Sequence, residues 1–297
     1  LLDILEGLGS LNKLADEIFK LCGKDFSYQI GWGNAASIIN DLSVTGAKPL
    51  TIKLFVAAGH QNWFIEKKRW QNLIKGFREA AKYSGASWNG GETQTLVGLV
   101  NPKSMVLAGS ATGIIKPKSR ILLEEKIQVG DRIILLASSG PHTNGITLIR
   151  KIFKNDLSVL IGAIKNKTII YSPLVNNLLD DGIELHYASH ITGHGWRKIM
   201  RPRRQLSYVI ENIPKPQAIF QKIQDKTGMS NEQIYGDYNM GAGFAIFASE
   251  GSVSRVVKIA EQLGYRTLDA GYVEKGPRRV VIKPIGVEFK GEELQIR

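Results

Sequence analysis

The chain has 297 residues, of which 43% are hydrophobic and 22% charged, an ordinary composition for a globular protein with room for two domains. It contains no apolar run long enough to span a bilayer and no signal-peptide pattern, and its one cysteine, Cys22, excludes an internal disulfide, so we expect a cytoplasmic protein that is not bound to a membrane. The net charge of +12 raises nucleic acid as a partner, but no recognisable RNA- or DNA-binding module surrounds the basic runs, and phosphorylated substrates explain the same surplus. The basic runs are Lys67-Lys68-Arg69, Arg197-Lys198 with Arg201, Arg203 and Arg204, and Arg278-Arg279.

Residues 1–6 predict a short strand, and Gly7-Leu8-Gly9-Ser10 predicts a glycine turn before a helix over residues 11–21. Glu6 stands at the end of the strand, where a carboxylate can hold Mg²⁺. A plain structural turn explains the same residues.

A helical pattern of small and aliphatic residues runs from Gly31 to Gly46 and is interrupted by Asn40-Asp41. A carboxylate among apolar neighbours costs free energy unless it is paired or bound to a metal. Asp41 is therefore a candidate metal ligand, and a solvated acid at a helix end is the alternative.

Residues 50–58 predict a strand, and residues 66–83 predict an amphipathic helix whose charged face is solvated. The stretch from Trp88 to Thr95 contains Gly90-Gly91-Glu92-Thr93. Adjacent glycines let the backbone approach a ligand closely, and Glu92 is a second candidate carboxylate for a metal. A hairpin loop would look similar.

Residues 105–115 predict another strand, and a basic, proline-containing connector over residues 116–120 follows. We therefore predict an N-terminal domain over residues 1–118 and a C-terminal domain over residues 119–297. Within the second, residues 155–168 have no clear periodicity, and residues 173–180 predict a short helix.

The segment from Ile133 to Lys151 predicts a buried strand, a tight loop and a helix. The loop is Ser138-Ser139-Gly140-Pro141-His142-Thr143-Asn144-Gly145. A loop of this kind directs backbone N–H groups and the positive end of a helix at one point, which suits a phosphate. An ordinary strand-to-helix turn uses the same residue types.

His186, His190 and His194 are spaced by four, as in a helical zinc site, but Gly193 and Gly195 argue against a continuous helix. We favour a glycine-rich turn that leads into a helix at Trp196. Further along the chain, residues 239–247 predict a glycine bend entering a buried strand, residues 253–264 a helix, and residues 271–285 one or two strands.

Taken together, these motifs resemble the phosphoribosylformylglycinamidine cyclo-ligase family, also called aminoimidazole ribonucleotide synthetase. The resemblance covers nearly all of the chain and follows the order of the family. The matching elements are Glu6-Gly7-Leu8-Gly9, Asn40-Asp41-Leu42 with Gly46-Ala47-Lys48-Pro49, Gly90-Gly91-Glu92-Thr93, Ser138 to Gly145 with Arg150-Lys151, His190-Ile191-Thr192-Gly193, and Asn239-Met240-Gly241-Ala242-Gly243.

The resemblance implies a two-domain α+β or α/β protein in which N-terminal strands close a β-barrel across a homodimer and the C-terminal domain is a layered α/β domain. It implies ATP and Mg²⁺ as cofactors, a small phosphorylated substrate, and ATP-dependent closure of formylglycinamidine ribonucleotide to aminoimidazole ribonucleotide. The implied metal ligands are Glu6, Asp41 and Glu92, and the implied nucleotide contacts are Gly7, Gly9, Asn40, Gly90, Gly91 and Thr93. On the substrate side it implies Ser138 to Gly145 with Thr192 and Gly193, with Asp41, His142 and His190 as catalytic groups.

Three departures from the family pattern stand out. Glu6 replaces an aspartate, His194 replaces a glycine of a triple-glycine turn, and the glycine-rich N-terminal segment of the family is absent from the sequence as given. Two other functions therefore stay open: a related ATP-dependent small-molecule kinase or synthetase, and a catalytically inactive relative.

Overall fold

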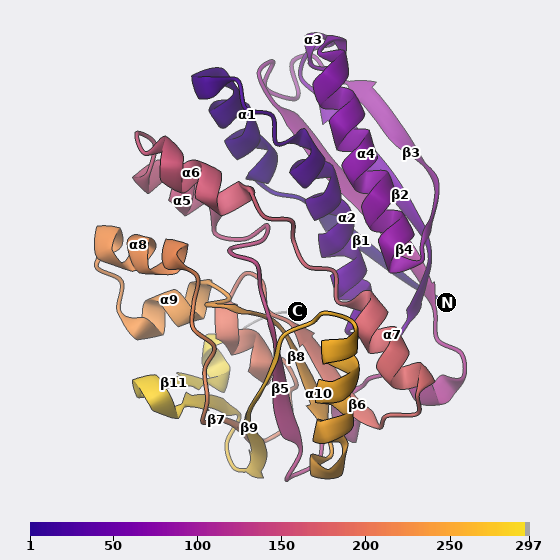
Figure 1. Cartoon of the computed structure of the whole chain (residues 1–297), viewed down its shortest axis with the longest axis vertical. Coiled ribbons are helices and arrows are strands. Elements are labelled where there is room, and N and C mark those ends of the chain that lie inside the picture. The colour runs from indigo at the N-terminus through magenta and orange to yellow at the C-terminus, as the bar shows by residue number, and fades with distance from the viewer. Residues whose placement is uncertain (295–297) are drawn as a thin grey trace. The chain divides into compact units, whose positions relative to one another are not determined.

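The computed structural model describes residues 1–294, which divide into two compact units (Figure 1). Unit 1 contains residues 1–42, 47–115 and 141–173, and unit 2 contains residues 43–46, 116–140 and the chain from Leu174 onward. The chain thus crosses between the units several times, whereas the sequence predicted one boundary at residues 118/119. The difference arises because residues 141–173 fold back into unit 1.

Unit 1 contains a four-stranded sheet in the order β1-β4-β2-β3, in which only the β2–β3 pair is parallel. Its elements are β1 (Leu2–Gly7), α1 (Leu11–Cys22), α2 (Ser27–Ser43), β2 (Lys48–Ala58), α3 (Asn62–Ile65), α4 (Lys67–Ser84), β3 (Ser87–Thr95), β4 (Met105–Ile114), α5 (Ile146–Ile152) and α6 (Leu157–Ile164).

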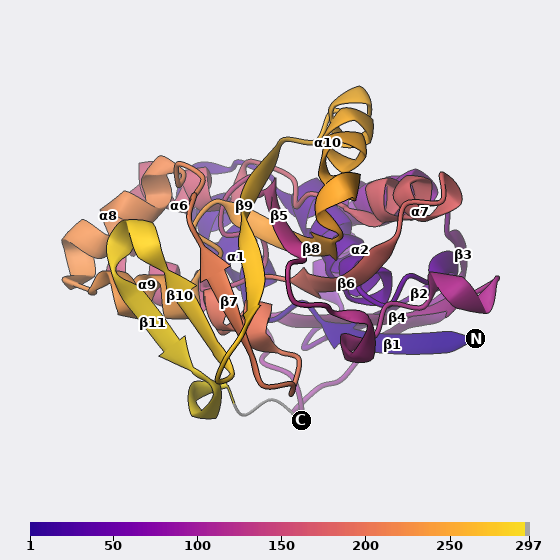
Figure 2. The same ribbon diagram turned by 90° about the horizontal axis from the view of Figure 1, so that it is seen from below.

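The two faces of this sheet differ in burial. Along β4 alternate residues are buried, and a Cβ atom placed on Gly109 would meet Ile38 of α2 at 2.8 Å, so this face lies under the helix. The intervening residues, such as Val106 and Ser110, are partly or largely exposed. We call the face of the sheet that carries these partly or largely exposed residues the open face. Figure 2 shows β1 and β4 with α2 on one side of them.

The helices α2 and α4 cross at two glycines. A Cβ atom on Gly31 would lie 1.9 Å from the carbonyl oxygen of Leu73, and one on Gly76 would lie 2.0 Å from that of Tyr28. The atom that each Cβ would meet belongs to the backbone of the other helix. It cannot move aside as the end of a flexible side chain could. The close packing of the two helices over the sheet therefore requires glycine at both positions.

Unit 2 contains a seven-stranded sheet in the order β11-β10-β7-β9-β5-β8-β6, which can be followed across Figure 2. Every residue of β7 and β8 is buried, as expected for strands covered on both faces. The elements are β5 (Arg132–Ala137), α7 (Ser172–Asp180), β6 (Leu185–His190), β7 (Leu206–Ile210), α8 (Ala218–Thr227), α9 (Asn231–Asp237), β8 (Ala242–Ala248), α10 (Val253–Gln262), β9 (Thr267–Lys275), β10 (Arg279–Ile282) and β11 (Val287–Lys290).

Most elements with a clear apolar period are confirmed, among them β1, α1, α4, β4, β5 and α10. The stretch from Trp88 to Thr95, for which a hairpin loop was the alternative, lies in an edge strand paired with β2. The helix predicted at Trp196 is present as a short 3₁₀ helix over Gly195–Met200. The stretch without clear periodicity contains α6, whose eight residues are nearly all apolar.

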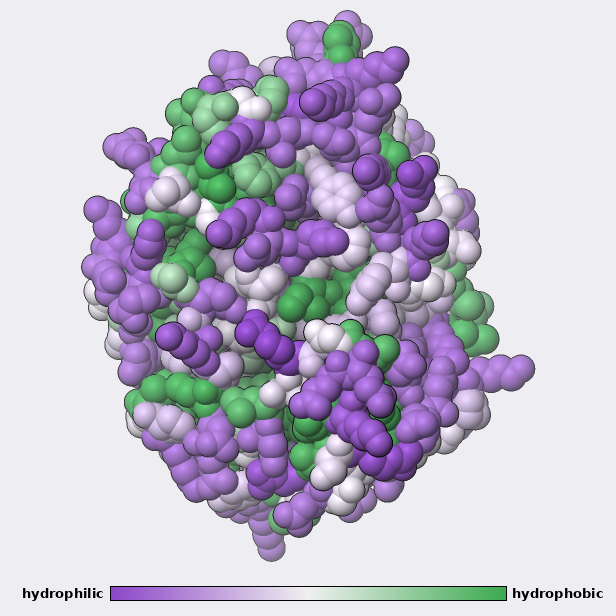
Figure 3. Space-filling view, viewed as in Figure 1, coloured by the Kyte–Doolittle hydropathy of each residue, from purple (hydrophilic) through white to green (hydrophobic). Residues whose placement is uncertain are grey.

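Most of the charged side of α4 is solvated, as the sequence predicted: Lys67, Lys68, Lys75 and Arg78 are exposed. Arg69 is the exception, since its side chain is only 11% exposed and pairs with Asp16. On the face shown in Figure 3 hydrophilic side chains predominate and hydrophobic ones form separate patches. No helix among residues 1–294 is both long and apolar enough to cross a membrane.

We predict that Gly76→Ala lowers the free energy of unfolding by about 1–3 kcal/mol, because the new methyl group meets the Tyr28 carbonyl and forces α2 and α4 apart. The matched control is Gly162→Ala in α6, where a Cβ atom meets nothing within 4 Å and alanine should stabilise the helix by about 0.5–1 kcal/mol. Chemical denaturation of both variants measures the difference. Equal unfolding midpoints would contradict the glycine contact.

Candidate functional site

Ser138, Ser139 and Gly140, which belong to unit 2, are held by the side chain of Asn239. The Ser138 hydroxyl donates to Asn239 Oδ1 at 2.9 Å, and Asn239 Nδ2 donates to the Gly140 carbonyl at 2.9 Å. Asn239 Oδ1 also accepts from the Gly241 N–H at 3.1 Å. On the other side, Gln217 Nε2 donates to the Ser138 carbonyl at 2.6 Å. Buried side chains thus fix the backbone of this half of the loop.

The second glycine-rich segment follows β6 in unit 2. His190 is buried at the end of β6, with its ring centroid 6.2 Å from that of Phe244. A Cβ atom on Gly195 would lie 2.1 Å from the Tyr235 carbonyl oxygen, so this position accepts only glycine. The next residue, Trp196, is fully buried and its indole N–H donates to the Asn239 carbonyl at 2.8 Å. Asn239 therefore links the loops on which the predicted substrate residues lie in unit 2.

His194 has a φ angle of 71°, in the left-handed region that favours glycine. Burial, together with the charges of Arg197 and Lys198, lowers the pKa of its imidazole below the ordinary value of 6.5. The departure from the family's triple glycine therefore places a non-glycine residue in a strained backbone conformation.

Several arginines of the basic runs form hydrogen bonds to backbone carbonyl groups within unit 2. Arg204 donates to the carbonyl groups of Glu124 and Ile127, and Arg197 donates to the Gly236 carbonyl at 2.7 Å. Arg278 likewise donates to the carbonyls of three residues, Met200, Pro202 and Gly291. These guanidinium groups have a structural role that their sequence positions did not reveal.

The other half of the predicted loop, from His142 to Gly145, belongs to unit 1. The Thr143 hydroxyl lies 3.0 Å from that of Ser37 on α2. His142 is buried, has a φ angle of 57°, and its ring centroid lies 6.4 Å from that of Tyr171. The helix that follows, α5, has only seven residues, which limits the helix dipole on which the phosphate argument relied.

Asn40, a predicted nucleotide contact, is completely buried. Its Nδ2 donates to the Ile169 carbonyl and its Oδ1 accepts from the Tyr171 N–H, both at 2.8 Å. Its neighbour Asp41 is half-buried on α2. The amide of Asn40 therefore holds the returning chain, and Asp41 is the more accessible of the pair.

Glu6 and Glu92 lie on opposite faces of the sheet of unit 1. Glu6 pairs with Gly109, and Gly109 pairs with Leu54, on the face under the helices. Glu92 pairs instead with Phe55, the next residue of β2, and consecutive residues of a strand point to opposite faces. Among residues 1–294 no three His, Cys, Asp or Glu side chains are grouped so as to hold a metal ion. Glu6, Asp41 and Glu92 of one chain therefore do not fit a shared magnesium site.

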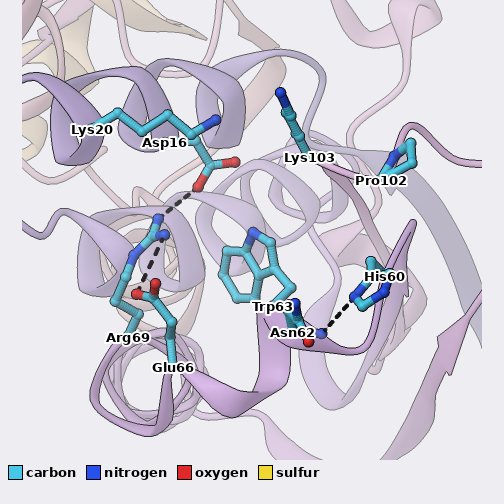
Figure 4. Close-up of a pocket in the computed structure, with 9 residues that line it drawn as sticks. All are labelled: Asp16, Lys20, His60, Asn62, Trp63, Glu66, Arg69, Pro102 and Lys103. Carbon is cyan, nitrogen blue, oxygen red and sulfur yellow. Dashed lines mark hydrogen bonds and ion pairs between the residues drawn. The ribbon is translucent and has the colours of Figure 1, made fainter.

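A cavity that the sequence did not single out lies within unit 1, beside α1 and the start of α4 (Figure 4). Its volume is about 550 Å³, and its lining includes Asp16, Trp63 and Arg69. The sequence signals were the basic run that contains Arg69 and a tryptophan, Trp63, in the polar stretch before α4. None of the predicted site residues lines this cavity.

The chain matches two family models, described as AIR synthase related protein, N-terminal domain, over residues 17–115, and AIR synthase related protein, C-terminal domain, over residues 128–283. The chain belongs to the AIR synthase related family. The two matched regions fall on either side of the connector at residues 116–120 and together cover most of the chain.

Two curated relatives in the AIR synthase related family are named phosphoribosylformylglycinamidine cyclo-ligase. The protein of Methanocaldococcus jannaschii is 33% identical over 245 residues, which are 78% of this chain and 68% of that protein. The protein of Clostridium perfringens (strain ATCC 13124) is 32% identical over 271 residues, which are 88% of this chain and 79% of that protein. The crystal structure of hydrogenase maturation protein HypE in complex with ATP has a TM-score of 0.66 at 15% identity, covering 88% of this chain and 78% of that one, which is a likeness of fold.

We predict that His194→Gly raises the free energy of unfolding by about 1 kcal/mol, because glycine tolerates a φ angle of 71°. His194→Ala is the matched control: it removes the imidazole but keeps the backbone strain, so it should bring no such gain. Since the pKa of His194 is lowered in the folded state, protonation below pH 6.5 favours the unfolded state. Both variants should therefore gain stability over the natural chain as the pH falls through this value, because both lack the imidazole. At neutral pH only His194→Gly should gain, and equal stability of the two variants there would contradict the strain.

Proposed function

We propose that this protein is an ATP-dependent phosphoribosylformylglycinamidine cyclo-ligase of de novo purine biosynthesis. The observation that carries the proposal is its similarity of about 30% identity, over most of the chain, to relatives with that name. The six motifs in family order and the two matched family models support the same function.

The proposed reaction has two steps. The γ-phosphoryl group of ATP passes to the formyl oxygen of formylglycinamidine ribonucleotide, which releases ADP and makes that oxygen part of a leaving group. The substrate nitrogen that completes the ring then attacks the formyl carbon, the carbon–oxygen bond breaks, and inorganic phosphate leaves as the nitrogen loses a proton. Phosphoryl transfer of this kind needs positioning and charge neutralisation more than covalent help from the protein.

The residues proposed for substrate binding lie on loops that buried side chains fix. In unit 2 these are Ser138, Ser139, Gly140, Thr192 and Gly193, and Asn239 supports them. In unit 1 they are His142 to Gly145, where Thr143 contacts α2. His142 and His190, which are both buried, are the groups proposed for proton transfer.

For the nucleotide we keep Gly7, Gly9, Gly90, Gly91 and Thr93 as proposed backbone and hydroxyl contacts. Glu6, Asp41 and Glu92 each remain a proposed cation ligand. They are proposed separately, because the three side chains do not gather into one site within a chain. We derive no step of the reaction through a bound metal ion.

We also propose that two copies associate through the open face of the sheet of unit 1. This face presents Leu5 and Val106, which are 77% and 49% exposed. Exposed aliphatic side chains on a sheet face are stabilised when a partner covers them. The resemblance supplies the occupant, a second copy whose strands complete a barrel.

The function is tested by incubating the protein with ATP and formylglycinamidine ribonucleotide and following ADP and aminoimidazole ribonucleotide. We expect equal amounts of both products. We expect Asp41→Asn to abolish turnover with little change in thermal stability, while Asp181→Asn, an exposed acid of unit 2, keeps normal activity. If Asp41→Asn turned over ATP at the normal rate, the catalytic role of Asp41 would be excluded. Absence of product in the natural chain, with no thermal stabilisation by Mg-ATP, would favour an inactive relative.

The association is tested by sedimentation of the full chain. Leu5→Lys should shift the population from dimer to monomer, because it places a charge in the proposed apolar contact. Leu263→Lys is the matched control, since Leu263 is an exposed leucine of unit 2 and should leave the dimer intact. A natural chain that sediments as a monomer at all concentrations would rule out the dimer.

A further inference from the structure

A cavity of about 570 Å³ lies within unit 2 and is lined by residues of two segments, 117–128 and 179–186. None of the residues proposed for the substrate or the nucleotide lines it. Its lining includes His186 near the start of β6, whereas the proposed catalytic group His190 is the last residue of that strand. Four residues of extended chain span about 13 Å, so the cavity is separate from the proposed active site.

Acidic side chains outnumber basic ones in the lining of this cavity. The acids are Glu125, Asp180 and Glu184, and the bases are Arg120 and Lys126. Both bases are already engaged, because the guanidinium of Arg120 pairs with Asp180 and Lys126 Nζ donates to a backbone carbonyl at 2.8 Å. In a chain with a net charge of +12, this local balance favours a cation as the ligand.

His186 supplies a buried nitrogen atom that has no hydrogen bond. The residue is 3% exposed, and its Nδ1 lies 2.8 Å from both carboxylate oxygens of Asp131, which is itself 2% exposed. A carboxylate can only accept, so Nδ1 carries the ring proton and Nε2 of the neutral ring carries a lone pair. Nε2 is buried and forms no hydrogen bond with any residue that the structure describes.

The local path of β6 gives His186 its position. Along the pairing of β6 with β8, Leu185 pairs with Ala248 and Tyr187 with Phe247, so the register skips His186. An extra residue of this kind in a strand turns a side chain out of the regular alternation. The imidazole thereby reaches Asp131 on one side, and on the other Glu184 Oε1 lies 3.4 Å from Nε2.

The distance of 3.4 Å between Nε2 and Oε1 matches two ligands of one tetrahedral ion. Zinc lies about 2.0–2.2 Å from histidine nitrogen and carboxylate oxygen, and tetrahedral angles then separate the two donors by about 3.3–3.5 Å. Octahedral Mg²⁺, at about 2.0–2.1 Å, would bring neighbouring donors to about 2.9 Å and prefers oxygen ligands. A carboxylate behind the imidazole, as Asp131 is here, is the usual support of a zinc-binding histidine.

We propose that His186 Nε2 and Glu184 bind a zinc ion at this cavity, with Asp131 orienting the imidazole. Two protein ligands leave two tetrahedral positions, which water or a donor group of a molecule in the cavity can take. The proposal does not rest on the proposed function, and the site is distinct from the three carboxylates proposed singly for cations in that function.

The test measures binding of zinc alone to the full chain by titration calorimetry. We expect Glu184→Gln to weaken zinc at least tenfold without affecting the fold, because the Glu184 side chain is 73% exposed. His186→Asn should abolish this binding, since its amide can still donate toward Asp131 but nothing replaces Nε2. Asp131→Asn, which removes the charge behind the ring, should weaken zinc by about 10–100-fold.

The matched controls are Glu261→Gln and His60→Asn, which change an exposed acid of unit 2 and an exposed histidine of unit 1. Both should bind zinc within twofold of the natural chain. About a hundredfold excess of Mg²⁺ should leave the zinc affinity unchanged, because the donor set and spacing do not suit that ion. Thermal unfolding shows that each variant is folded.

The proposal is overturned if the natural chain does not bind zinc, or if folded Glu184→Gln and His186→Asn bind it with unchanged affinity. In that case His186 and Glu184 form only an ion pair beside the cavity. Weakening by the two controls as strong as that by the site variants would likewise show that zinc binds at scattered surface groups, and would overturn the site.

Discussion

The hydrogen bonds of two buried side chains on α2 hold the returning segment of chain, and the division of the molecule into units depends on them. The indole N–H of Trp32 donates to the Thr168 carbonyl at 2.7 Å, and the amide of Asn40 serves both Ile169 and Tyr171. Three backbone groups of an irregular stretch thereby find partners away from water. Without these partners, burial of the stretch in unit 1 would leave backbone groups unsatisfied, and the half of the proposed substrate loop that precedes it along the chain would lose support.

Asn239 plays the corresponding part in unit 2. Its amide donates to one loop through Gly140 and accepts from Ser138 and Gly241. Asn40 and Asn239 both come from motifs that carry the family resemblance, and both use a donor and an acceptor on the same short side chain. Aspartate has no donor and serine is shorter, so the requirement for asparagine at both positions follows from backbone satisfaction alone. A sequence motif at a site thus includes residues that shape the loops as well as residues that touch the ligand.

The sequence predicted elements where one face is buried and the other is solvated, as in α1 and α4, because a fixed period then separates the two sets of side chains. It could not predict α6, which is apolar on all sides, or β3, whose glycines conceal an edge strand. It identified carboxylates by type, but the faces on which Glu6 and Glu92 lie depend on the register of three pairings among four strands. The cavity of unit 1 joins segments about forty residues apart, and no local pattern links Asp16 to Trp63.

The hydrogen bond of the Ser138 hydroxyl limits how the proposed substrate loop can recognise a phosphate. A phosphate anion needs hydrogen-bond donors, and the single donor of a serine hydroxyl is its O–H group. In Ser138 this group already donates to Asn239 Oδ1, and the residue is completely buried. Recognition of an anion by this loop therefore falls to backbone N–H groups and to hydroxyls other than that of Ser138. The Ser138 hydroxyl instead holds the loop against Asn239, and under the proposed function this is a contribution of positioning that suits phosphoryl transfer.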